Sequence, residues 1–221
     1  MTAALQPTVA GRVLALPGRP LDSCRLLHWF PGLLTATEAE QCFQQLLHQH
    51  DWPASDYEVF GRCFRLPRQQ TWHADPGIVY SYHNNLLVTR PWSPLLLGLR
   101  HQVEAATGLV FNSVLVNLYR TGQEYVGWHS DDDPEMGADP VIASLSLGAA
   151  RPFSFRPLVA GTTGSVDTDA EVPADSLLLE AGDLLLMAPD FQHHWQHAVL
   201  PCEHSSERIN LTFRYVYPPQ V

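Results

Sequence analysis

Residues 208–214 read Arg-Ile-Asn-Leu-Thr-Phe-Arg, a strict alternation of polar and apolar side chains. A period of two places successive side chains on opposite faces of a β-strand, so the apolar face packs on a core. The opposite face carries Arg208, Asn210, Thr212 and Arg214. Arginine grips a carboxylate with two parallel hydrogen bonds, and a buried arginine needs a partner. The segment therefore predicts a strand with a carboxylate clamp.

A second segment, residues 128–133, reads Trp-His-Ser-Asp-Asp-Asp and has the spacing of metal ligands. On an extended backbone, His129 and Asp131 lie at i and i+2 and point to the same face. A third imidazole from His197 would complete two nitrogens and one carboxylate, the facial triad that leaves half of an iron coordination sphere open. Spacing alone does not choose the third ligand, because the region contains His193, His194, His197 and His204.

Two more polar residues precede the triad. Asn117 and Tyr119 are i and i+2 on a predicted strand and share a face that excludes Leu118. Buried Asn and Tyr are usually core polar groups satisfied by hydrogen bonds. They can equally donate to the far end of a bound dicarboxylate. The triad and the arginine pair together indicate an iron enzyme with a dicarboxylate co-substrate.

The length and composition predict one soluble globular domain. The chain has 221 residues, of which 45% are hydrophobic, and a mean hydropathy of −0.10. It has no secretory signal pattern and no apolar run long enough to span a bilayer. The dispersed cysteines predict reduced thiols, and they are Cys24, Cys42, Cys63 and Cys202. We therefore expect a cytoplasmic monomer with no membrane partner.

The charge balance counts against nucleic-acid binding through the overall field of the protein. The formal net charge is −10 at pH 7, and all 13 basic residues are arginine, with no lysine. Nucleic-acid-binding proteins are usually basic. Any nucleic acid must therefore meet a local arginine patch. The best candidates for this patch are Arg62, Arg65 and Arg68, with Arg90 and Arg100 further on.

The first half of the chain predicts an arm and two helices. Residues 1–20 contain three prolines and two glycines and indicate a loosely ordered arm. Thr37 and Glu40 have the spacing of a capping box that begins a helix ending near His50. A Ser-Pro pair and a glycine frame a second helix over 94–107.

From about residue 110 the chain predicts β-strands. Short β-rich runs are separated by clusters of Gly, Pro and Asp, and 160–175 indicates a long surface hairpin or loop. Residues 51–92 have weak periodicity, which indicates short strands and loops. Helices followed by strands predict an α+β, mainly β fold with helices packed on a jelly roll. The predicted strands are Val110–Tyr119, Val141–Leu147, Pro152–Pro157, Ser176–Leu179, Asp183–Met187, Trp195–Val199 and Arg208–Tyr217.

Four motifs in order resemble the AlkB family of Fe(II)/2-oxoglutarate-dependent dioxygenases. They are Asn-Leu-Tyr-Arg at 117–120, Trp-His-Ser-Asp-Asp at 128–132, Val-Ile-Ala-Ser-Leu-Ser-Leu-Gly-Ala at 141–149 and Arg-Ile-Asn-Leu-Thr-Phe-Arg at 208–214. The resemblance covers roughly 55–217. It implies a double-stranded β-helix with N-terminal helices, as a single dioxygenase domain over 21–221. A nucleotide-recognition lid would occupy about 55–92 and the jelly-roll core about 110–217.

The resemblance also implies what the site residues bind. The iron ligands would be His129, Asp131 and His197. The 2-oxoglutarate residues would be Arg208, Asn117 and Tyr119 at the distal carboxylate and Arg214 near the chelating end, with Asn210 and Thr212 on the same strand face. Dioxygen would be the second co-substrate.

The substrates implied by the resemblance are N-methylated bases such as 1-methyladenine and 3-methylcytosine. They would lie in single- or double-stranded DNA, or in RNA. The methyl group is hydroxylated and leaves as formaldehyde, while 2-oxoglutarate becomes succinate and CO2. The reaction would reverse alkylation damage directly, and the target base must leave the stack to reach the iron.

The lid residues that would choose the substrate are aromatic and acidic. Trp72, Tyr80 and Tyr82 would sandwich the base, although aromatic core packing explains them equally well. Phe60 resembles an apolar wedge that fills the gap left by the flipped base. Asp132 and Asp133 would accept hydrogen bonds from the exocyclic amine. Relatives often carry Glu in place of Asp133 and Tyr in place of His73, so these two positions bear on substrate preference.

Two alternatives remain open from the sequence. The first keeps the iron and 2-oxoglutarate chemistry but acts on RNA, a protein side chain or a small molecule. The second is a non-catalytic jelly-roll binding module with a structural metal. A module that only binds has no need of the arginine clamp, so the clamp favours an enzyme.

Overall fold

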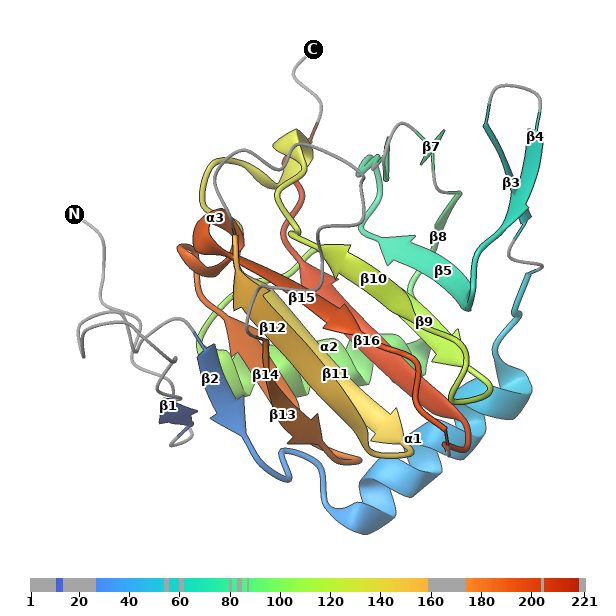
Figure 1. The fold of residues 1–221 in the computed structure, drawn as a ribbon, viewed down its shortest axis with the longest axis vertical. Coiled ribbons are helices and arrows are strands. Elements are labelled where there is room, and N and C mark those ends of the chain that lie inside the picture. The colour runs from blue at the N-terminus through green and yellow to red at the C-terminus, as the bar shows by residue number, and fades with distance from the viewer. Residues whose placement is uncertain are drawn as a thin grey trace.

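Two β-sheets face each other, and helices cover the outer face of the larger one (Figure 1). The computed structural model describes residues 11–13, 27–53, 56–59, 62–79, 81–82, 85–86, 88–158, 174–203 and 205–218. An apolar cluster that contains Leu115 and Ile142 of the larger sheet and Phe153 and Phe155 of the smaller one fills one end of the space between the sheets. The predicted mainly β architecture, a jelly roll with N-terminal helices, is confirmed.

The larger sheet has eight strands. Their order is β1 (Arg12–Val13), β2 (Leu27–Phe30), β14 (Leu184–Met187), β11 (Ile142–Gly148), β16 (Arg208–Arg214), β9 (Ser113–Tyr119), β5 (Gln69–Ala74) and β8 (Thr89–Arg90). Neighbouring strands are antiparallel except β5 and β8, which are parallel. Strands distant in sequence therefore lie side by side, and β16 pairs with both β9 and β11.

The smaller sheet brings two distant parts of the chain together. Its order is β10 (Val126–His129), β15 (Trp195–Val199), β12 (Arg151–Pro157) and β13 (Asp175–Leu179), all antiparallel. The pairing of β10 with β15 joins segments about 70 residues apart. This pairing builds the functional site.

The alternation in β16 has the predicted effect, but neither face of the strand meets water. The apolar face, Ile209, Leu211 and Phe213, packs on the helices in the main apolar cluster. The polar face points between the sheets, and every residue of β16 is buried. A buried polar face needs internal partners or a ligand.

Helices α1 (Ala36–Gln49) and α2 (Pro94–Thr107) begin and end at side-chain and glycine caps. Ser93 caps α2, and Gly108 ends it with φ 72°, which glycine adopts without strain. The predicted cap of α1 was wrong: Thr35, not Thr37, forms the capping box with Glu38. This earlier start adds residues to the helix while both reciprocal hydrogen bonds form.

In the range predicted as the lid, the described residues form six short strands. Strands β3 (Asp56–Val59) and β4 (Arg62–Arg65) form one hairpin, and β6 (Ser81–Tyr82) pairs with β7 (Asn85–Leu86). Figure 1 shows the β3–β4 hairpin extending away from the sheets. Strands β5 and β8, within the same range, belong to the larger sheet.

Other expectations are only partly covered by the structure. Of the arm at 1–20, Arg12–Val13 pair with β2, and the rest except Gly11 lies outside the described residues, as does the loop at 160–173. Cys42 is a free thiol, as predicted for it, while Cys24 lies outside the described residues. Among the helices that the structure describes, none is long and apolar enough to cross a membrane.

Candidate functional site

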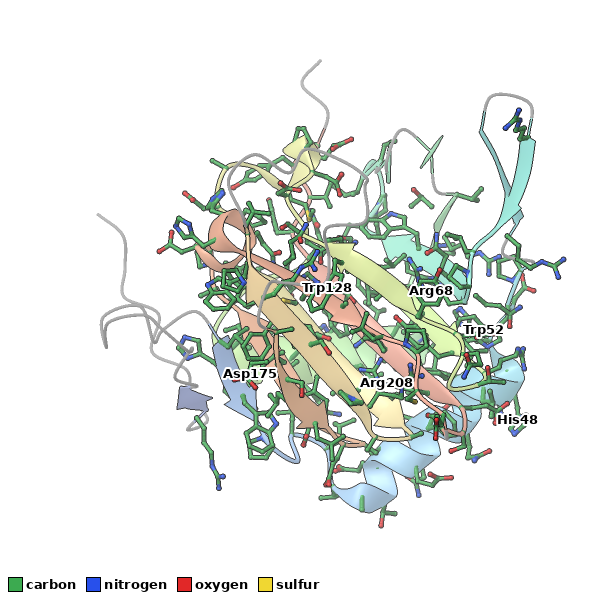
Figure 2. The ribbon with its side chains drawn as sticks, in the orientation of Figure 1. His48, Trp52, Arg68, Trp128, Asp175 and Arg208 are labelled. Carbon is green, nitrogen blue, oxygen red and sulfur yellow. The ribbon has the colours of Figure 1, made fainter. Side chains whose placement is uncertain are left out.

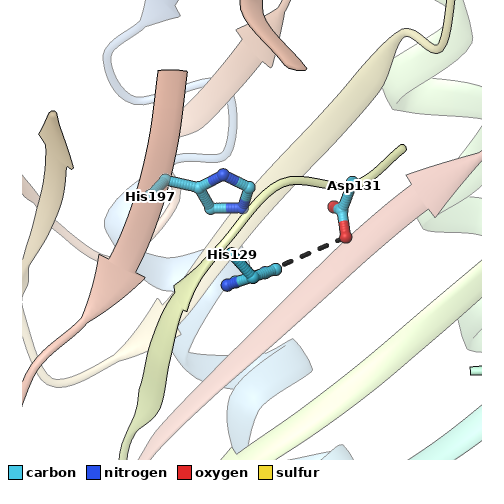
Figure 3. A group of neighbouring side chains, drawn as sticks. All are labelled: His129, Asp131 and His197. Carbon is cyan, nitrogen blue, oxygen red and sulfur yellow. Dashed lines mark ion pairs between the residues drawn. The ribbon is translucent and has the colours of Figure 1, made fainter. Parts of the chain in front are cut away.

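His129 and His197 lie opposite each other on the paired strands β10 and β15. His129 is the last residue of β10, and Asp131 follows two residues later in the loop. Figure 3 shows the two imidazoles and the carboxylate turned toward one another. Of the candidate distal histidines, His193 and His194 are exposed on the short helix α3 (Phe191–His194), and His204 lies outside the described residues.

The three side chains have the geometry of a metal-ligand set. One ligand atom from each lies within 4.8 Å of the other two. His129 Nε2 is 3.9 Å from Asp131 Oδ1, and the imidazole centroids are 4.2 Å apart. The Gly127 carbonyl oxygen is 2.8 Å from His129 Nδ1, so that nitrogen carries the proton and Nε2 keeps its lone pair. This second contact orients the ring, as is usual for metal-binding histidines.

The electrostatics keep all three groups in their metal-binding protonation states. Burial and the neighbouring His129 lower the pKa of His197 to about 3, and burial likewise lowers the pKa of His129. Burial opposes the charged carboxylate of Asp131, but Arg214 and both histidines outweigh it and lower its pKa to about 2. At neutral pH the set is two neutral imidazoles and one carboxylate, which a divalent cation can bind without displacing protons.

Asp131 is held by residues from two other elements. Arg214 Nη2 donates to Asp131 Oδ1 at 2.9 Å. The backbone N–H of Asp131 donates to Gln192 Oε1 of α3, also at 2.9 Å. Sequence analysis did not find Gln192, because a single glutamine in a polar segment has no distinguishing pattern. Its only sequence signal is its place five residues before His197.

All residues predicted to hold the metal and the co-substrate line one cavity between the sheets. They are His129, Asp131, His197, Asn117, Tyr119, Arg208, Asn210, Thr212 and Arg214. Apolar residues complete its wall, among them Leu115, Phe153, Met187 and Val199. A cavity with a metal-ligand set, an apolar wall and a few convergent buried polar groups has the features of a ligand site.

Arg208 is the residue in this cavity whose hydrogen-bonding capacity is least satisfied. It is 1% exposed, and Nη2 donates to Ser146 Oγ at 2.9 Å. Nε and Nη1 are buried and have no hydrogen-bond partner in the described part of the chain. Burial lowers its pKa to about 10, so the guanidinium is still charged at pH 7. A buried cation with unmatched donors fits an anionic ligand such as a carboxylate.

Asn210 and Thr212 lie on the same strand face but bond mainly to protein. Asn210 Nδ2 donates to Ser144 Oγ at 2.8 Å and to the Leu145 carbonyl oxygen at 3.2 Å. Thr212 Oγ1 donates to Asn210 Oδ1 at 2.9 Å. These bonds fix the cavity wall, which leaves Arg208, Asn117 and Tyr119 as the better candidates for direct contact with a ligand.

The predicted substrate residues are placed less favourably. Trp72 is 1% exposed in the apolar cluster between the sheets, so it packs as a core residue and offers no accessible face to a base. Asp132 is exposed and Asp133 half-buried, and neither is among the described residues that line the cavity. Phe60, Tyr80 and the side chain of Tyr82 lie outside the described residues.

The arginine patch predicted for nucleic acid was largely wrong. Arg62 and Arg65 are exposed on β4, but Arg68 is 6% exposed and lines the cavity. Arg90 pairs with Asp51, and Arg100 pairs with Asp75 and Glu104. The bend at 67–68 turns the chain inward after β4, which separates Arg68 from its sequence neighbours.

Comparison with known proteins matches this geometry to a family. The model of the 2OG-Fe(II) oxygenase superfamily matches residues 26–214. The chain is 33% identical to "DNA oxidative demethylase ALKBH2" of Bos taurus, over 92% of this chain and 77% of that protein. The chain belongs to the AlkB family of 2OG-Fe(II) oxygenases. The resemblance drawn from the four motifs is thus confirmed.

Other relatives of this AlkB-family chain support the same placement. It is 40% identical to "Alpha-ketoglutarate-dependent dioxygenase alkB homolog 3" of Bos taurus, over 85% of this chain and 65% of that protein. The chain thus spans slightly less than two thirds of that relative's length. The structure solved as "The structure of OsALKBH1" is similar with a TM-score of 0.60 at 18% identity, covering 86% of this chain and 97% of that one. This last likeness supports the fold.

The groups implied by the superfamily, Fe(II) and 2-oxoglutarate, fit the residues present. Two imidazoles and one carboxylate are a suitable set for Fe(II) and leave positions open for other ligands. The unmatched donors of Arg208 fit a carboxylate at the other side of the same cavity. The cavity itself therefore fits both groups, independently of the family.

Proposed function

We propose that this protein is an Fe(II)/2-oxoglutarate-dependent dioxygenase that removes N-linked methyl groups from DNA bases. The observation that carries the proposal is Arg208, which has two buried donors without a partner in the described part of the chain and lines the cavity that also contains the His-Asp-His set. A module that binds metal for structure alone has no use for a buried carboxylate receptor. The names of the relatives, among them a DNA oxidative demethylase, support DNA as the substrate.

The residues of the chain would orient and isolate the reactants. His129, Asp131 and His197 would hold the iron, and Arg214 would keep Asp131 charged and fixed through its 2.9 Å hydrogen bond. Arg208, Asn117 and Tyr119 would hold the distal carboxylate of 2-oxoglutarate. Bound iron, 2-oxoglutarate and dioxygen supply the oxidant that inserts one oxygen atom into a C–H bond of the methyl group. The apolar wall around Phe153 and Met187 would exclude water.

The products follow from atom balance. Hydroxylation of the methyl carbon gives an N-hydroxymethyl base. The bond between the base nitrogen and this carbon then breaks, so formaldehyde leaves and the nitrogen regains its lone pair or its proton. 2-Oxoglutarate loses CO2 and becomes succinate, which takes the second oxygen atom. One succinate per formaldehyde is therefore expected when the two half-reactions are coupled.

The test is turnover on a defined lesion. Purified protein with Fe(II), ascorbate and 2-oxoglutarate should release succinate and formaldehyde from a single-stranded oligodeoxynucleotide that contains 3-methylcytosine. The same lesion in duplex DNA and in RNA ranks the three substrates. His129→Ala should abolish turnover and metal binding while circular dichroism reports a folded protein. Succinate release no faster than without oligonucleotide, on all three nucleic acids, would contradict the nucleic-acid substrate.

A further inference from the structure

Arg68 is the third arginine that lines the cavity, in addition to Arg208 and Arg214. It lies in the bend between β4 and β5, where Figure 2 labels it. Its exposed fraction is 6%. Arg62 and Arg65 on β4 are exposed, so burial of this one arginine must be compensated by its contacts. Those contacts identify what it does.

The Arg68 side chain fixes the orientation of the Asn117 amide. Arg68 Nε is 2.9 Å from Asn117 Oδ1. A guanidinium can only donate, so Asn117 must present its oxygen to Arg68 and its NH2 group elsewhere. No protein acceptor for that NH2 group lies in the described part of the chain, and Asn117 lines the cavity. Arg68 therefore leaves the donor of Asn117 available to a ligand.

The remaining contacts hold Arg68 itself in place. Nη2 donates to Gln70 Oε1 at 3.3 Å, and Nη1 donates to the Tyr125 carbonyl oxygen at 3.4 Å. The Tyr125 backbone N–H in turn donates to the Pro67 carbonyl oxygen at 3.0 Å. The guanidinium is thus fixed between the start of β5 and the loop before β10.

The charges around the cavity are unbalanced without a ligand. Arg214 pairs with Asp131, but Arg68 and Arg208 have no carboxylate partner among the residues that the structure describes. Two buried cations without counterions are unfavourable. A dicarboxylate ligand would supply the missing negative charge, whereas a monocarboxylate that only chelates the metal would leave both cations uncompensated.

We propose that Arg68 is a positioning residue for the co-substrate, which orients the Asn117 amide and adds a second uncompensated positive charge, so that the cavity selects a dicarboxylate. The inference rests on the proposed function, because the ligand is the 2-oxoglutarate of that reaction. It reassigns Arg68 from the nucleic-acid patch to the co-substrate cavity. The competing explanation is that Arg68 only braces the loop at Tyr125.

Ligand binding without turnover separates these explanations. Protein loaded with Mn(II) under anaerobic conditions is titrated with 2-oxoglutarate by calorimetry, and Mn(II) affinity is measured separately. Arg68→Met should weaken 2-oxoglutarate binding by roughly 10- to 100-fold, the usual effect of losing a charged hydrogen bond. Mn(II) affinity and oligonucleotide affinity should stay within about twofold, because Arg68 is assigned to neither ligand. The affinity for a monocarboxylate 2-oxoacid of equal chain length should fall much less in Arg68→Met.

Arg120→Met is the matched control. Arg120 also bonds to a glutamine of β5, with Nε 2.7 Å from Gln69 Oε1, but it is exposed and outside the described lining of the cavity. Its removal should leave 2-oxoglutarate affinity unchanged. Equal losses in both variants would indicate bracing of β5 and overturn the proposal.

A double-mutant cycle tests the route through Asn117. If Arg68 acts by orienting this amide, Asn117→Ala should cost less 2-oxoglutarate affinity in the Arg68→Met background than in the wild type. Independent, additive losses overturn the proposal. If Arg68→Met does not fold, Arg68→Lys is used in its place, because lysine retains the charge but not the planar fork of donors. An affinity of Arg68→Lys for 2-oxoglutarate equal to that of the wild type would also overturn the proposal. A wild type that binds no 2-oxoglutarate would instead contradict the proposed function itself.

Discussion

Gln192 fixes the backbone of a candidate metal ligand without contacting the metal position. It is 1% exposed, and its Oε1 accepts the Asp131 backbone N–H, while its Nε2 lies 3.5 Å from Met187 Sδ. Gln192 and His197 also lie on one short segment, α3 and β15. The carboxylate and the second imidazole are therefore positioned by the same local structure.

Gln192→Met should weaken metal binding. Methionine has a similar length but no strong acceptor, so the buried N–H of Asp131 loses its partner and the loop can shift. We expect a loss of roughly 10-fold or more in Mn(II) affinity, as is typical when the support of a metal ligand is removed. Calorimetric titration of the metal-free protein checks this.

Gln196→Met serves as the control for this substitution. Gln196 precedes His197 on β15, and its Oε1 accepts from Arg156 instead of from the Asp131 loop. Its loss should leave Mn(II) affinity near that of the wild type. Equal Mn(II) affinity in Gln192→Met and the wild type would refute the role of Gln192.

Single residues show where sequence analysis succeeds and where it fails. Arg208 could be found from the alternation in β16, and His129 and Asp131 from their i and i+2 spacing, although Asp131 lies in the loop after β10. Gln192 could not, because its contact with Asp131 spans 61 residues and depends on the pairing of β10 with β15. Arg68 was grouped with Arg62 and Arg65 because proximity in sequence does not reveal an inward bend.

At the scale of elements, the junction between α1 and β5 is built on a half-buried histidine, His50. His50 Nε2 is 2.7 Å from Thr71 Oγ1 of β5, and the His50 ring lies 5.2 Å from that of His73. Burial, together with His73 and Arg90, lowers the pKa of His50 to about 4 from 6.5. In the unfolded chain His50 would titrate at its ordinary value, so protonation favours unfolding.

Acid should therefore destabilise this junction over a defined pH range. The contribution of neutral His50 is complete above pH 6.5 and is lost progressively as the pH falls toward 4. We expect the Tm of the metal-free protein to fall over this range, and to fall less steeply in His50→Gln, which retains a polar partner for Thr71. Thermal unfolding followed by circular dichroism at each pH measures the slope.

His48→Gln is the control on the same helix, because His48 is exposed. Its profile should follow that of the wild type. His50→Gln and wild-type curves that remain parallel between pH 6.5 and 4 would show that His50 does not contribute. The other buried histidines titrate in all three proteins, so the comparison isolates His50.

Elements with strong local patterns were predicted well, and those that depend on partners were not. Helix α2 has a proline and a capping serine at one end and glycine at the other, and its bounds were correct. The start of α1 was misplaced because Thr35-x-x-Glu38 and Thr37-x-x-Glu40 are overlapping capping boxes. Strands β2 and β10 were missed, since four residues each carry little periodicity and pairing with β14 and β15 stabilises them.

At the scale of the whole molecule, few of the arginines that the structure describes remain on the surface to meet nucleic acid. Arg68, Arg151, Arg156, Arg208 and Arg214 are buried. Arg90 and Arg100 are paired with carboxylates. On the described surface, the exposed arginines of the lid range are Arg62 and Arg65 of the β3–β4 hairpin. Electrostatic attraction should therefore contribute little to the affinity for a strand of DNA.

The salt dependence of DNA binding should accordingly be shallow. Neutralising about two phosphates of a single strand gives a slope of log affinity against log salt of roughly −1.4. Fluorescence anisotropy with a labelled methylated oligonucleotide at several salt concentrations measures it. Arg62→Ala should make the slope shallower by about 0.7.

Arg12→Ala is the matched control for the salt experiment. Arg12 lies in β1, on the opposite side of the molecule from the β3–β4 hairpin (Figure 1). Its removal lowers the positive charge by the same amount and should leave the slope unchanged. A slope steeper than about −4 for the wild type would mean that many more cations meet the DNA than this surface provides.

The arginine-only cation set has a chemical consequence for the proposed reaction. Formaldehyde released in the cavity condenses readily with unprotonated primary amines, and this chain has no lysine. The cations that line the cavity are the guanidiniums of Arg68, Arg208 and Arg214, which are much weaker nucleophiles than a primary amine. The cavity can thus bind an anionic co-substrate tightly without offering an ε-amine to its own aldehyde product. Self-inactivation by cross-linking at lysine is absent by composition.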